Sequence, residues 1–396
     1  MTEFPTISWS DAGVTQTVRW RSEAGVPPPK RVVVADDATT ADVAYRLACE
    51  GTALLWRGDF QNARQLLQAM SRRAERKPRK PAATPLDAFH QHRQAQAQKA
   101  RTLGMLLIPL EGDYAIALRR APDVKAACEE AYGPPSAASA ESAGSAESAK
   151  ATASAVSLRE LLGLVGAHEW RKKGVEIPAL NARIHPYYGV FSPVRGEYVD
   201  LVARSPLPPS VELAFDIGTG TGVLAAVLAS RGVKRVVATD QDPRALACAR
   251  ENLERLGYAR QVDVVEADLF PPGRASLVVC NPPWVPARPA SPIERAVFDP
   301  DSRMLRGFLD GLKEHLAPGG EGWLILSDFA EHLGLRSREM LTDAIANAGL
   351  EVAGRDDIRP RHPKASDPSD PLFRARAAEL TSLWRLRAKP GEAPAA

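Results

Sequence analysis

Cysteine is scarce in this chain, and several other features are missing altogether. The 396 residues include four cysteines, which stand far apart and form no Cys-x-x-Cys pair. A disulfide framework or a zinc site is therefore not expected, and reduced, mostly buried thiols fit a cytosolic setting. No apolar run is long enough to cross a bilayer. The first residues, MTEFPTISWSDAG, lack the basic and apolar regions of a secretory signal. We expect a cytoplasmic protein that needs neither a metal nor a membrane.

An excess of charge of one sign is also lacking. The chain has 51 lysines and arginines against 48 aspartates and glutamates, which gives a net charge of +3. This balance is too mild to imply nucleic-acid binding by itself. The length and a hydrophobic fraction of 44% allow two or three domains with sizeable cores.

The clearest boundary is a run without any aromatic or large aliphatic side chain. Residues 136–155 read SAASAESAGSAESAKATASA. Such a run buries too little apolar surface to offset its ordering entropy. We therefore predict a flexible linker over residues 134–156, an α+β accessory domain over 1–133, and a second domain over 157–396.

The first domain shows secondary-structure patterns but no catalytic constellation. Residues 31–35 predict a strand, 41–56 a helix, and Asp59 the start of a second helix. Residues 105–118 predict a β-hairpin. The stretch SRRAERKPRK at 71–80 has six basic residues and one acid, which suits a phosphate backbone or a solvated loop.

Strands and helices alternate through the second domain. Strand patterns occupy 212–217, 234–239, 262–266, 277–280, 322–326, 350–354 and 380–386, with helix patterns between most of them, the last at 331–348. Repeated β-α-β units predict an α/β, Rossmann-like, doubly wound and mostly parallel sheet with helices on both faces. Ligands of such sheets bind beyond the carboxyl ends of the strands.

A glycine-rich turn follows the first of these strands. Asp216 precedes Gly218, Gly220 and Gly222, and Val223 stands where a dinucleotide fingerprint needs its third glycine. The glycines let the backbone turn tightly and approach a ligand. S-adenosylmethionine (SAM) has a sulfonium cation and an amino-acid tail instead of a pyrophosphate, so an acid beside the loop suits SAM better than NAD. An NAD-dependent oxidoreductase is the disfavoured alternative.

Acidic residues also end the next two strands. Asp240 is placed to accept from both ribose hydroxyls, and Asp268 from an adenine amine, while Leu269 offers a backbone N–H and an apolar contact. The carboxyl ends of these strands share one rim of the sheet. We predict a SAM site formed by Asp216, the three glycines and these residues.

The fourth strand ends in the motif Asn281-Pro282-Pro283-Trp284. With DIGTGTG, Asp240 and Asp268 in order before it, the sequence resembles class I methyltransferases that bear an Asn-Pro-Pro-Tyr/Phe/Trp motif. These include amino-methylating DNA and RNA enzymes and the release-factor glutamine methyltransferases. The resemblance covers roughly residues 185–386 and implies a seven-stranded sheet.

The resemblance also implies how a planar nitrogen is methylated. In this family the Asn side-chain oxygen and the carbonyl of the first Pro hold the two N–H bonds, which map to Asn281 and Pro282. Pro283 stiffens the loop and Trp284 stacks on the acceptor. Upstream, residues 185–198 cover the cofactor or line the acceptor pocket in the family, which makes Phe191 a candidate for substrate contact.

The acceptor itself stays open at this level. An rRNA or tRNA base amino group and a protein glutamine amide are about equally favoured, with a DNA amino group third. A non-catalytic SAM- or RNA-binding module is the alternative from another class. The expected partners are RNA, a ribosomal particle or a protein substrate.

Overall fold

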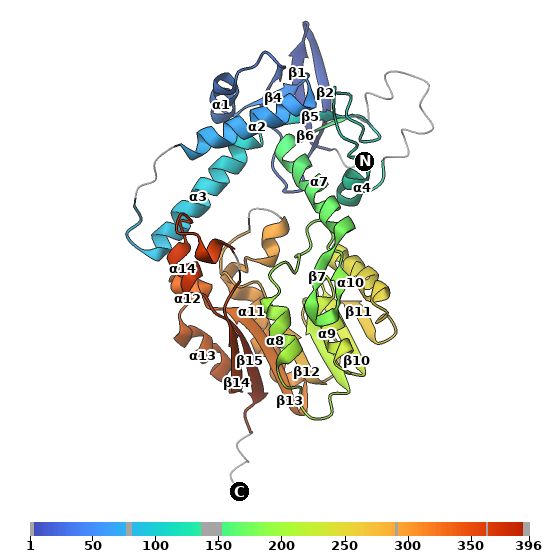
Figure 1. Cartoon of the computed structure of the whole chain (residues 1–396), viewed down its shortest axis with the longest axis vertical. Coiled ribbons are helices and arrows are strands. Elements are labelled where there is room, and N and C mark those ends of the chain that lie inside the picture. The colour runs from blue at the N-terminus through green and yellow to red at the C-terminus, as the bar shows by residue number, and fades with distance from the viewer. Residues whose placement is uncertain (1–3, 77–80, 136–152, 290–291, 362, 391–396) are drawn as a thin grey trace. The chain divides into compact units, whose positions relative to one another are not determined.

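The computed structural model describes residues 4–76, 81–135, 153–289, 292–361 and 363–390. It divides into two compact units (Figure 1). The first comprises Met1–Pro81 and His90–Glu169, and the second Ala82–Phe89 and Trp170–Ala396. Most of the predicted linker lies outside the described residues. No helix in the described part of the chain is long and apolar enough to span a membrane.

A six-stranded sheet forms the centre of the first unit, in the order β1-β2-β6-β5-β4-β3. The strands are β1 (Thr6–Asp11), β2 (Val14–Arg21), β3 (Arg31–Ala35), β4 (Thr52–Trp56), β5 (Leu106–Leu110) and β6 (Ser154–Ser157). The helices are α1 (Ala41–Cys49), α2 (Phe60–Glu75), α3 (Pro85–Leu103), α4 (Lys125–Tyr132) and α7 (Leu158–Lys173). Helices α3 and α7 each have residues in both units. The unit's main core contains Trp56, Phe60 and Met70.

Two predictions in this unit are wrong. The helix predicted over 41–56 ends at Cys49, because Gly51 turns the chain at φ +79° and the next five residues form the fully buried strand β4. A short run that is apolar on all sides cannot be assigned to helix or strand by periodicity. The hairpin predicted at 105–118 is absent: β5 pairs with β4 and with β6, and residues 114–118 form no strand.

The second unit contains a seven-stranded sheet in the order β11-β10-β9-β12-β13-β15-β14. Its strands are β9 (Leu213–Ile217), β10 (Arg235–Asp240), β11 (Val262–Glu266), β12 (Ala275–Cys280), β13 (Leu316–Ser327), β14 (Leu350–Ile358) and β15 (Thr381–Ala388). The first five run parallel, and β15 is antiparallel to both β13 and β14. The predicted α/β sheet of seven mostly parallel strands is confirmed.

Helices pack on this sheet around two large apolar clusters. They are α8 (Glu197–Arg204), α9 (Val223–Ser230), α10 (Pro243–Arg255), α11 (Arg303–His315), α12 (Phe329–His332), α13 (Arg338–Asn347) and α14 (Phe373–Ala378). Short 3-10 turns occur at η1 (Pro178–Leu180), η2 (Pro292–Ala296), η3 (Pro300–Ser302) and η4 (Pro363–Ser366), and β7 (Val175–Ile177) pairs with β8 (Ala182–Ile184).

The helix predicted over 331–348 is divided between α12 and α13. Gly334 between them has φ +73°, and Ser337 starts α13 by accepting a hydrogen bond from the backbone N–H of Met340. The other predicted elements of this unit are present, although β13 and β14 are longer than the predicted strands at 322–326 and 350–354. The side chain of Asp242 caps α10, and Gly257 follows the end of this helix at φ +80°.

The strand order places a switch point between β9 and β12. From β9 the chain first adds β10 and β11 on one side, and then returns to add β12 and β13 on the other. Loops that leave the carboxyl ends of β9 and β12 therefore diverge, and the crevice between them is where doubly wound sheets bind ligands.

Candidate active site

A cavity of about 750 Å³ lies at this switch point and is lined by residues of the second unit. Its wall includes residues 218–221 after β9, Asp240 at the end of β10, Leu269 after β11, and Asn281 after β12. The structure thus brings the ends of four strands together around one space. The volume is in the range of small-molecule and cofactor sites.

The glycine loop, residues 218–222, adopts a backbone that side chains disfavour. Gly218, Gly220 and Gly222 have φ angles of +71°, +56° and +80°. A Cβ on Gly218 would stand 2.4 Å from the Met304 methyl group, and one on Gly222 would stand 3.2 Å from the Ala249 Cα. The glycines are therefore needed both for the turn and for close packing.

Asp216 organises this loop from beneath and does not line the cavity. Its Oδ2 accepts hydrogen bonds from the Thr219 hydroxyl at 2.6 Å and from the Ala225 backbone N–H at 3.0 Å. The side chain is fully buried, and burial raises its pKa to about 6. These two hydrogen bonds hold the glycine loop and the start of α9 in place.

Asp240 presents a carboxylate to the cavity. Oδ2 accepts from the backbone N–H of Gly220 at 3.0 Å, and Oδ1 accepts from that of Asp242 at 3.0 Å. Each carboxylate oxygen keeps lone-pair capacity for a further donor. Burial raises the pKa of Asp240. Two fixed oxygens with free lone pairs fit the vicinal hydroxyls of a ribose.

Leu269 lines the cavity, whereas the preceding residue, Asp268, does not. Leu269 lines the cavity with φ +73°, and its carbonyl accepts from the Thr239 hydroxyl at 2.6 Å. Asp268 is absent from the lining: its carboxylate accepts from the Gln241 amide and pairs with Arg303 at 2.8 Å. In this arrangement Asp268 is placed to hold the start of α11, so its predicted contact with an adenine amine stays a prediction.

The motif of residues 281–284 follows β12. Asn281 and Pro283 line the cavity, while Pro282 is buried behind it. The indole N–H of Trp284 donates to Asn281 Oδ1 at 2.9 Å. On the other side of the indole, the Arg195 guanidinium lies 5.6 Å from the ring centroid. The predicted acceptor oxygen is therefore fixed by the aromatic residue of its own motif.

The segment of residues 185–198 forms another part of the wall. Phe191, Gly189 and Tyr198 line the cavity, and the rings of Phe191 and Tyr198 are 6.3 Å apart. The predicted position of Phe191 beside the site agrees with this lining, and its contact with a substrate stays a prediction.

Asn252 on α10 ties this segment to the glycine loop. Its Oδ1 accepts from the backbone N–H of His185 at 2.8 Å, and its Nδ2 donates to the carbonyls of Thr221 and His185 at 3.1 and 3.3 Å. Asn252 is 1% exposed. One buried amide thus fixes two walls of the cavity relative to each other.

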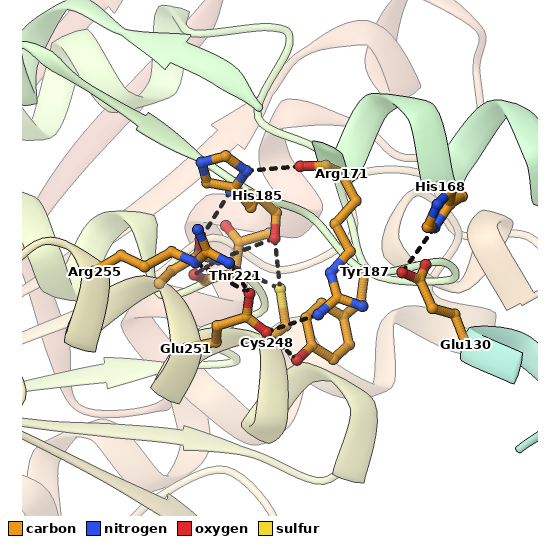
Figure 2. Close-up of polar contacts among 10 residues, drawn as sticks. Glu130, His168, Arg171, His185, Tyr187, Thr221, Cys248, Glu251 and Arg255 are labelled. Carbon is orange, nitrogen blue, oxygen red and sulfur yellow. Dashed lines mark hydrogen bonds and ion pairs between the residues drawn. The ribbon is translucent and has the colours of Figure 1, made fainter. Parts of the chain in front are cut away.

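Glu251, the preceding residue, holds the outer part of the same segment. It accepts from the Tyr187 hydroxyl, from Arg171 at 2.7 Å and from Arg255 at 2.7 Å. Figure 2 shows these side chains converging on Glu251, with the Arg171 guanidinium 3.8 Å from the Tyr187 ring centroid. The segment is therefore anchored on both sides of Pro186.

The sequence predicts a lid or substrate loop over the Pro-rich connection of residues 285–300, but it does not predict which residues there and at the start of α11 line the cavity. Phe298, Asp299, Arg303 and Met304 line the cavity. The Asp299 carboxylate accepts from the backbone N–H groups of Met304 and Leu305 at 3.0 to 3.1 Å, which fixes the start of α11. The signal was the unusual length of the Pro-rich connection after Trp284, which predicts a functional loop but not its contacts.

The predicted basic stretch at 71–80 lies in the first unit, partly beyond the described residues. Arg73 within it pairs with Asp42 at 2.7 Å. Cys128, Cys248 and Cys280 are buried free thiols, and Cys49 is an exposed one. In the described ranges no three His, Cys, Asp or Glu side chains are grouped to hold a metal ion.

Part of the second unit matches a known protein family. Residues 182–348 match the family model of the methyltransferase small domain. The second unit carries a methyltransferase small domain. This match confirms the resemblance to class I SAM-dependent methyltransferases, and the domain takes SAM as its cofactor.

Curated relatives cover parts of the same region. The chain is 37% identical over 145 residues to a ribosomal protein L11 methyltransferase of Pelotomaculum thermopropionicum, which is 36% of this chain and 39% of that protein. It is 32% identical over 157 residues to a release factor glutamine methyltransferase of Geobacter sulfurreducens, 36% of this chain and 52% of the relative. The chain thus spans about two fifths to one half of the length of these relatives.

Among solved structures, a ribosomal protein L11 methylase from Lactobacillus delbrueckii subsp. bulgaricus aligns with a TM-score of 0.34 at 16% identity. That alignment covers 50% of this chain and 79% of the other.

The residues of the cavity fit SAM in the methyltransferase domain. Asp240 offers two oxygens for the ribose hydroxyls, Leu269 offers its apolar side chain and backbone for the adenine, and the glycine loop leaves room where a Cβ would intrude. Asn281 lines the same cavity, so a group held there would lie beside the cofactor.

Proposed function

We propose that this chain is a SAM-dependent N-methyltransferase that acts on a planar nitrogen, either a base amino group of RNA or the amide of a protein glutamine. The main support is the position of Asn281 at the carboxyl end of β12, in one cavity with the glycine loop and Asp240. Matched relatives named release factor glutamine methyltransferase add support, because a glutamine amide nitrogen is planar.

The chemistry needs a lone pair to be turned out of conjugation. When bound, SAM supplies an electrophilic methyl group. Asn281 Oδ1 and the Pro282 carbonyl accept the two N–H bonds of the acceptor and orient its lone pair towards that methyl carbon. Since the methylated nitrogen is cationic, it loses a proton to water without a strong base. Orientation of well-placed reactants can supply about 7–11 kcal/mol of the rate enhancement.

The hydrogen bond from Trp284 is compatible with this role. A carboxamide oxygen has two lone pairs. One accepts the indole N–H at 2.9 Å, and the other stays available for the acceptor nitrogen. The bond also prevents the amide from rotating its NH₂ group towards the substrate, which would present a donor where an acceptor is required.

The test is transfer of isotope-labelled methyl from SAM to fractionated RNA and protein from cells that lack this gene. We expect label in one of the two fractions, and hydrolysis followed by mass spectrometry to place it on an amino or amide nitrogen. Label on a carbon or a carboxylate oxygen would contradict the proposal.

Asn281→Ala gives the sharpest single test of the site. Loss of one oriented acceptor should cost about 3 kcal/mol of transition-state stabilisation, roughly a hundredfold in kcat. The affinity for SAM, measured by calorimetry, should change little, because Asn281 serves the acceptor. The control Asn347→Ala alters an asparagine on α13, outside the cavity lining. Unchanged turnover in Asn281→Ala would remove the proposed mechanism.

A further inference from the structure

A second cavity of about 580 Å³ lies on the methyltransferase domain, lined by residues that follow β14 and residues that precede β15. We call it the arginine cavity. Its charged lining consists of Arg359, Arg361, Arg376 and Glu379. The lining therefore carries three cations and one anion.

Two of these cations carry no partner charge. Arg359 and Arg361 are exposed, and neither side chain forms an ion pair with any residue that the structure describes. Arg361 is held through its backbone, whose N–H donates to Glu197 Oε1 at 2.6 Å. The guanidinium groups are therefore free to bind a ligand while their backbone is anchored.

Arg376 is held more firmly and still has an unused donor. Its guanidinium lies 5.0 Å from the Phe329 ring centroid, and its Nε stands 3.4 Å from Asp370 Oδ2. The geometry of that contact makes no hydrogen bond, so Nε is buried without an acceptor among the described residues. A bound anion within reach of this N–H would supply the missing acceptor.

Glu379 does not cancel the positive charge of the cavity. Its side chain is 3% exposed, and Oε1 accepts from the Ser327 hydroxyl at 2.7 Å and from Arg195 Nη2 at 3.1 Å. Arg195 thus compensates this carboxylate from outside the lining. Arg359 and Arg361 therefore remain in excess, while Arg376 is paired with Asp370.

The same Arg195 links the arginine cavity to the motif of residues 281–284. Its guanidinium lies 5.6 Å from the Trp284 ring centroid, and Trp284 donates to Asn281 Oδ1. One side chain therefore contacts both the wall of the cavity and the aromatic ring beside the acceptor oxygen.

We propose that the arginine cavity binds a backbone phosphate of an RNA whose base amino group is methylated at Asn281. This inference rests on the proposed function and assigns its acceptor class. Arginine pairs with phosphate through parallel hydrogen bonds. Every nucleotide carries a phosphate, so an RNA acceptor always supplies the anion, and bases of single-stranded RNA can be splayed out into a site. A protein acceptor would need an acidic residue at one fixed distance from its glutamine.

The experiment uses the full chain and a fluorescein-labelled, mixed-sequence, single-stranded oligoribonucleotide. Fluorescence anisotropy is measured from roughly 50 to 200 mM salt, where phosphate contacts dominate the salt dependence. The test variant is Arg359→Gln/Arg361→Gln. The matched control, Arg374→Gln, removes an exposed arginine on α14 that does not line the cavity.

We expect the double variant to bind this RNA about tenfold or more weakly, with the slope of log affinity against log salt reduced by about 1. The control should stay within about twofold of the parent protein. SAM affinity by calorimetry should be equal in all three proteins. A double variant that binds like the control would overturn the inference, as would a parent protein that binds no RNA.

Two further arms separate this inference from the proposed function. If labelled methyl enters a protein glutamine, and the double variant loses that activity, the anion belongs to a protein and the RNA assignment is wrong, while N-methylation stands. If a DNA oligonucleotide of the same sequence binds and is methylated as well as the RNA, the RNA assignment also falls. Label on carbon removes the proposed function whatever the anisotropy shows.

Discussion

The indole of Trp284 has one polar atom, and this atom donates to Asn281 Oδ1. On the face of the ring lies Arg195, which is itself fixed by the buried carboxylate of Glu379. The orientation of the Asn281 amide is thus set by a chain of three side chains behind it. At the scale of single residues, the orientation of the proposed acceptor oxygen, Asn281 Oδ1, depends on side chains that stand behind it.

Trp284→Phe tests that dependence. Phenylalanine keeps an aromatic ring but removes the N–H that orients Asn281, and one such hydrogen bond contributes about 0.5–1.5 kcal/mol. We expect kcat to fall by about three- to tenfold while the KM for SAM stays the same, measured by labelled-methyl transfer under saturating acceptor. Trp170→Phe, at a tryptophan that is 50% exposed and outside the cavity lining, is the control. A kcat equal to that of the control would show that the indole N–H is dispensable.

Asp216 predicts a dependence of stability on pH. Burial raises its pKa to about 6 in the folded protein, against an ordinary value near 3.8. Between these values the folded state binds the proton more tightly than the unfolded state. This group's contribution to the free energy of unfolding therefore decreases as pH rises from about 4 to about 6, by up to about 3 kcal/mol.

Chemical denaturation of the parent protein and of Asp216→Asn across this pH range checks the sign. The stability of the parent relative to the variant should decline between pH values of about 4 and 6 and stay constant above about 7. Asp343→Asn, at an exposed aspartate on α13, should show no such change. A relative stability that rises with pH would contradict the conclusion that burial raises the pKa of Asp216.

At the scale of elements, the segment of residues 185–198 is positioned by one helix. Helix α10 supplies Asn252 for the backbone of His185 and Glu251 for the hydroxyl of Tyr187 (Figure 2). Because Asn252 also donates to the Thr221 carbonyl, the same helix fixes the glycine loop. Two walls of the cavity at the switch point therefore share a single support.

Asn252→Ala should disturb both walls at once. Its removal leaves buried backbone groups of His185 and Thr221 without partners, which costs about 1–3 kcal/mol for each unsatisfied group. We expect lower stability in thermal melts together with a SAM affinity reduced by about tenfold or more in calorimetry. Glu254→Ala, on the exposed side of α10, is the matched control. A variant that loses stability but binds SAM normally would show that the walls are positioned independently.

Much of the second unit follows from local signals in the sequence. Strands β9 to β12 and helix α10 could be predicted closely because their signals are local. Asp242 caps α10, Gly257 ends it, and each apolar strand stands directly before its acidic turn. Strand β6 could not, because a four-residue strand after a run of small residues becomes recognisable only through its neighbours β2 and β5.

In the candidate site, too, some features follow from local sequence and others do not. Asp240, the glycines and Asn281 stand at the ends of predictable strands, and the structure places them around one cavity. The orientation of a side chain is a different matter. Asp268 faces Gln241 and Arg303, and the bond from Trp284 to Asn281 depends on a turn through two prolines. These side-chain orientations are set by packing between segments that are distant in the chain, and they cannot be predicted from one sequence.

At the scale of the whole molecule, the chain has two units, each with its own hydrophobic cores. The residues that fit SAM all belong to the second unit, and the first unit holds a sheet of a different strand order. Each unit should therefore respond separately to a ligand of the other.

Ligand-induced stabilisation tests this separation and the choice of cofactor together. SAM at about a hundredfold excess over its Kd should add about 2.7 kcal/mol to the unfolding free energy of the second unit. In calorimetric melts that transition should move up by several degrees, while unfolding of the first unit stays in place. NAD at the same concentration should shift neither. A shift with NAD and none with SAM would overturn the cofactor assignment.

The position of β6 in the sheet affects how the first unit folds during its synthesis. It stands between β2 and β5, inside a sheet whose other strands all precede residue 111. During synthesis that sheet lacks an inner member until residues 154–157 have left the ribosome, since chains emerge at about 5–20 residues per second. For the several seconds in between, β2 and β5 each have an unpaired edge. A nascent chain stalled at that point is the form of this protein most in need of a chaperone.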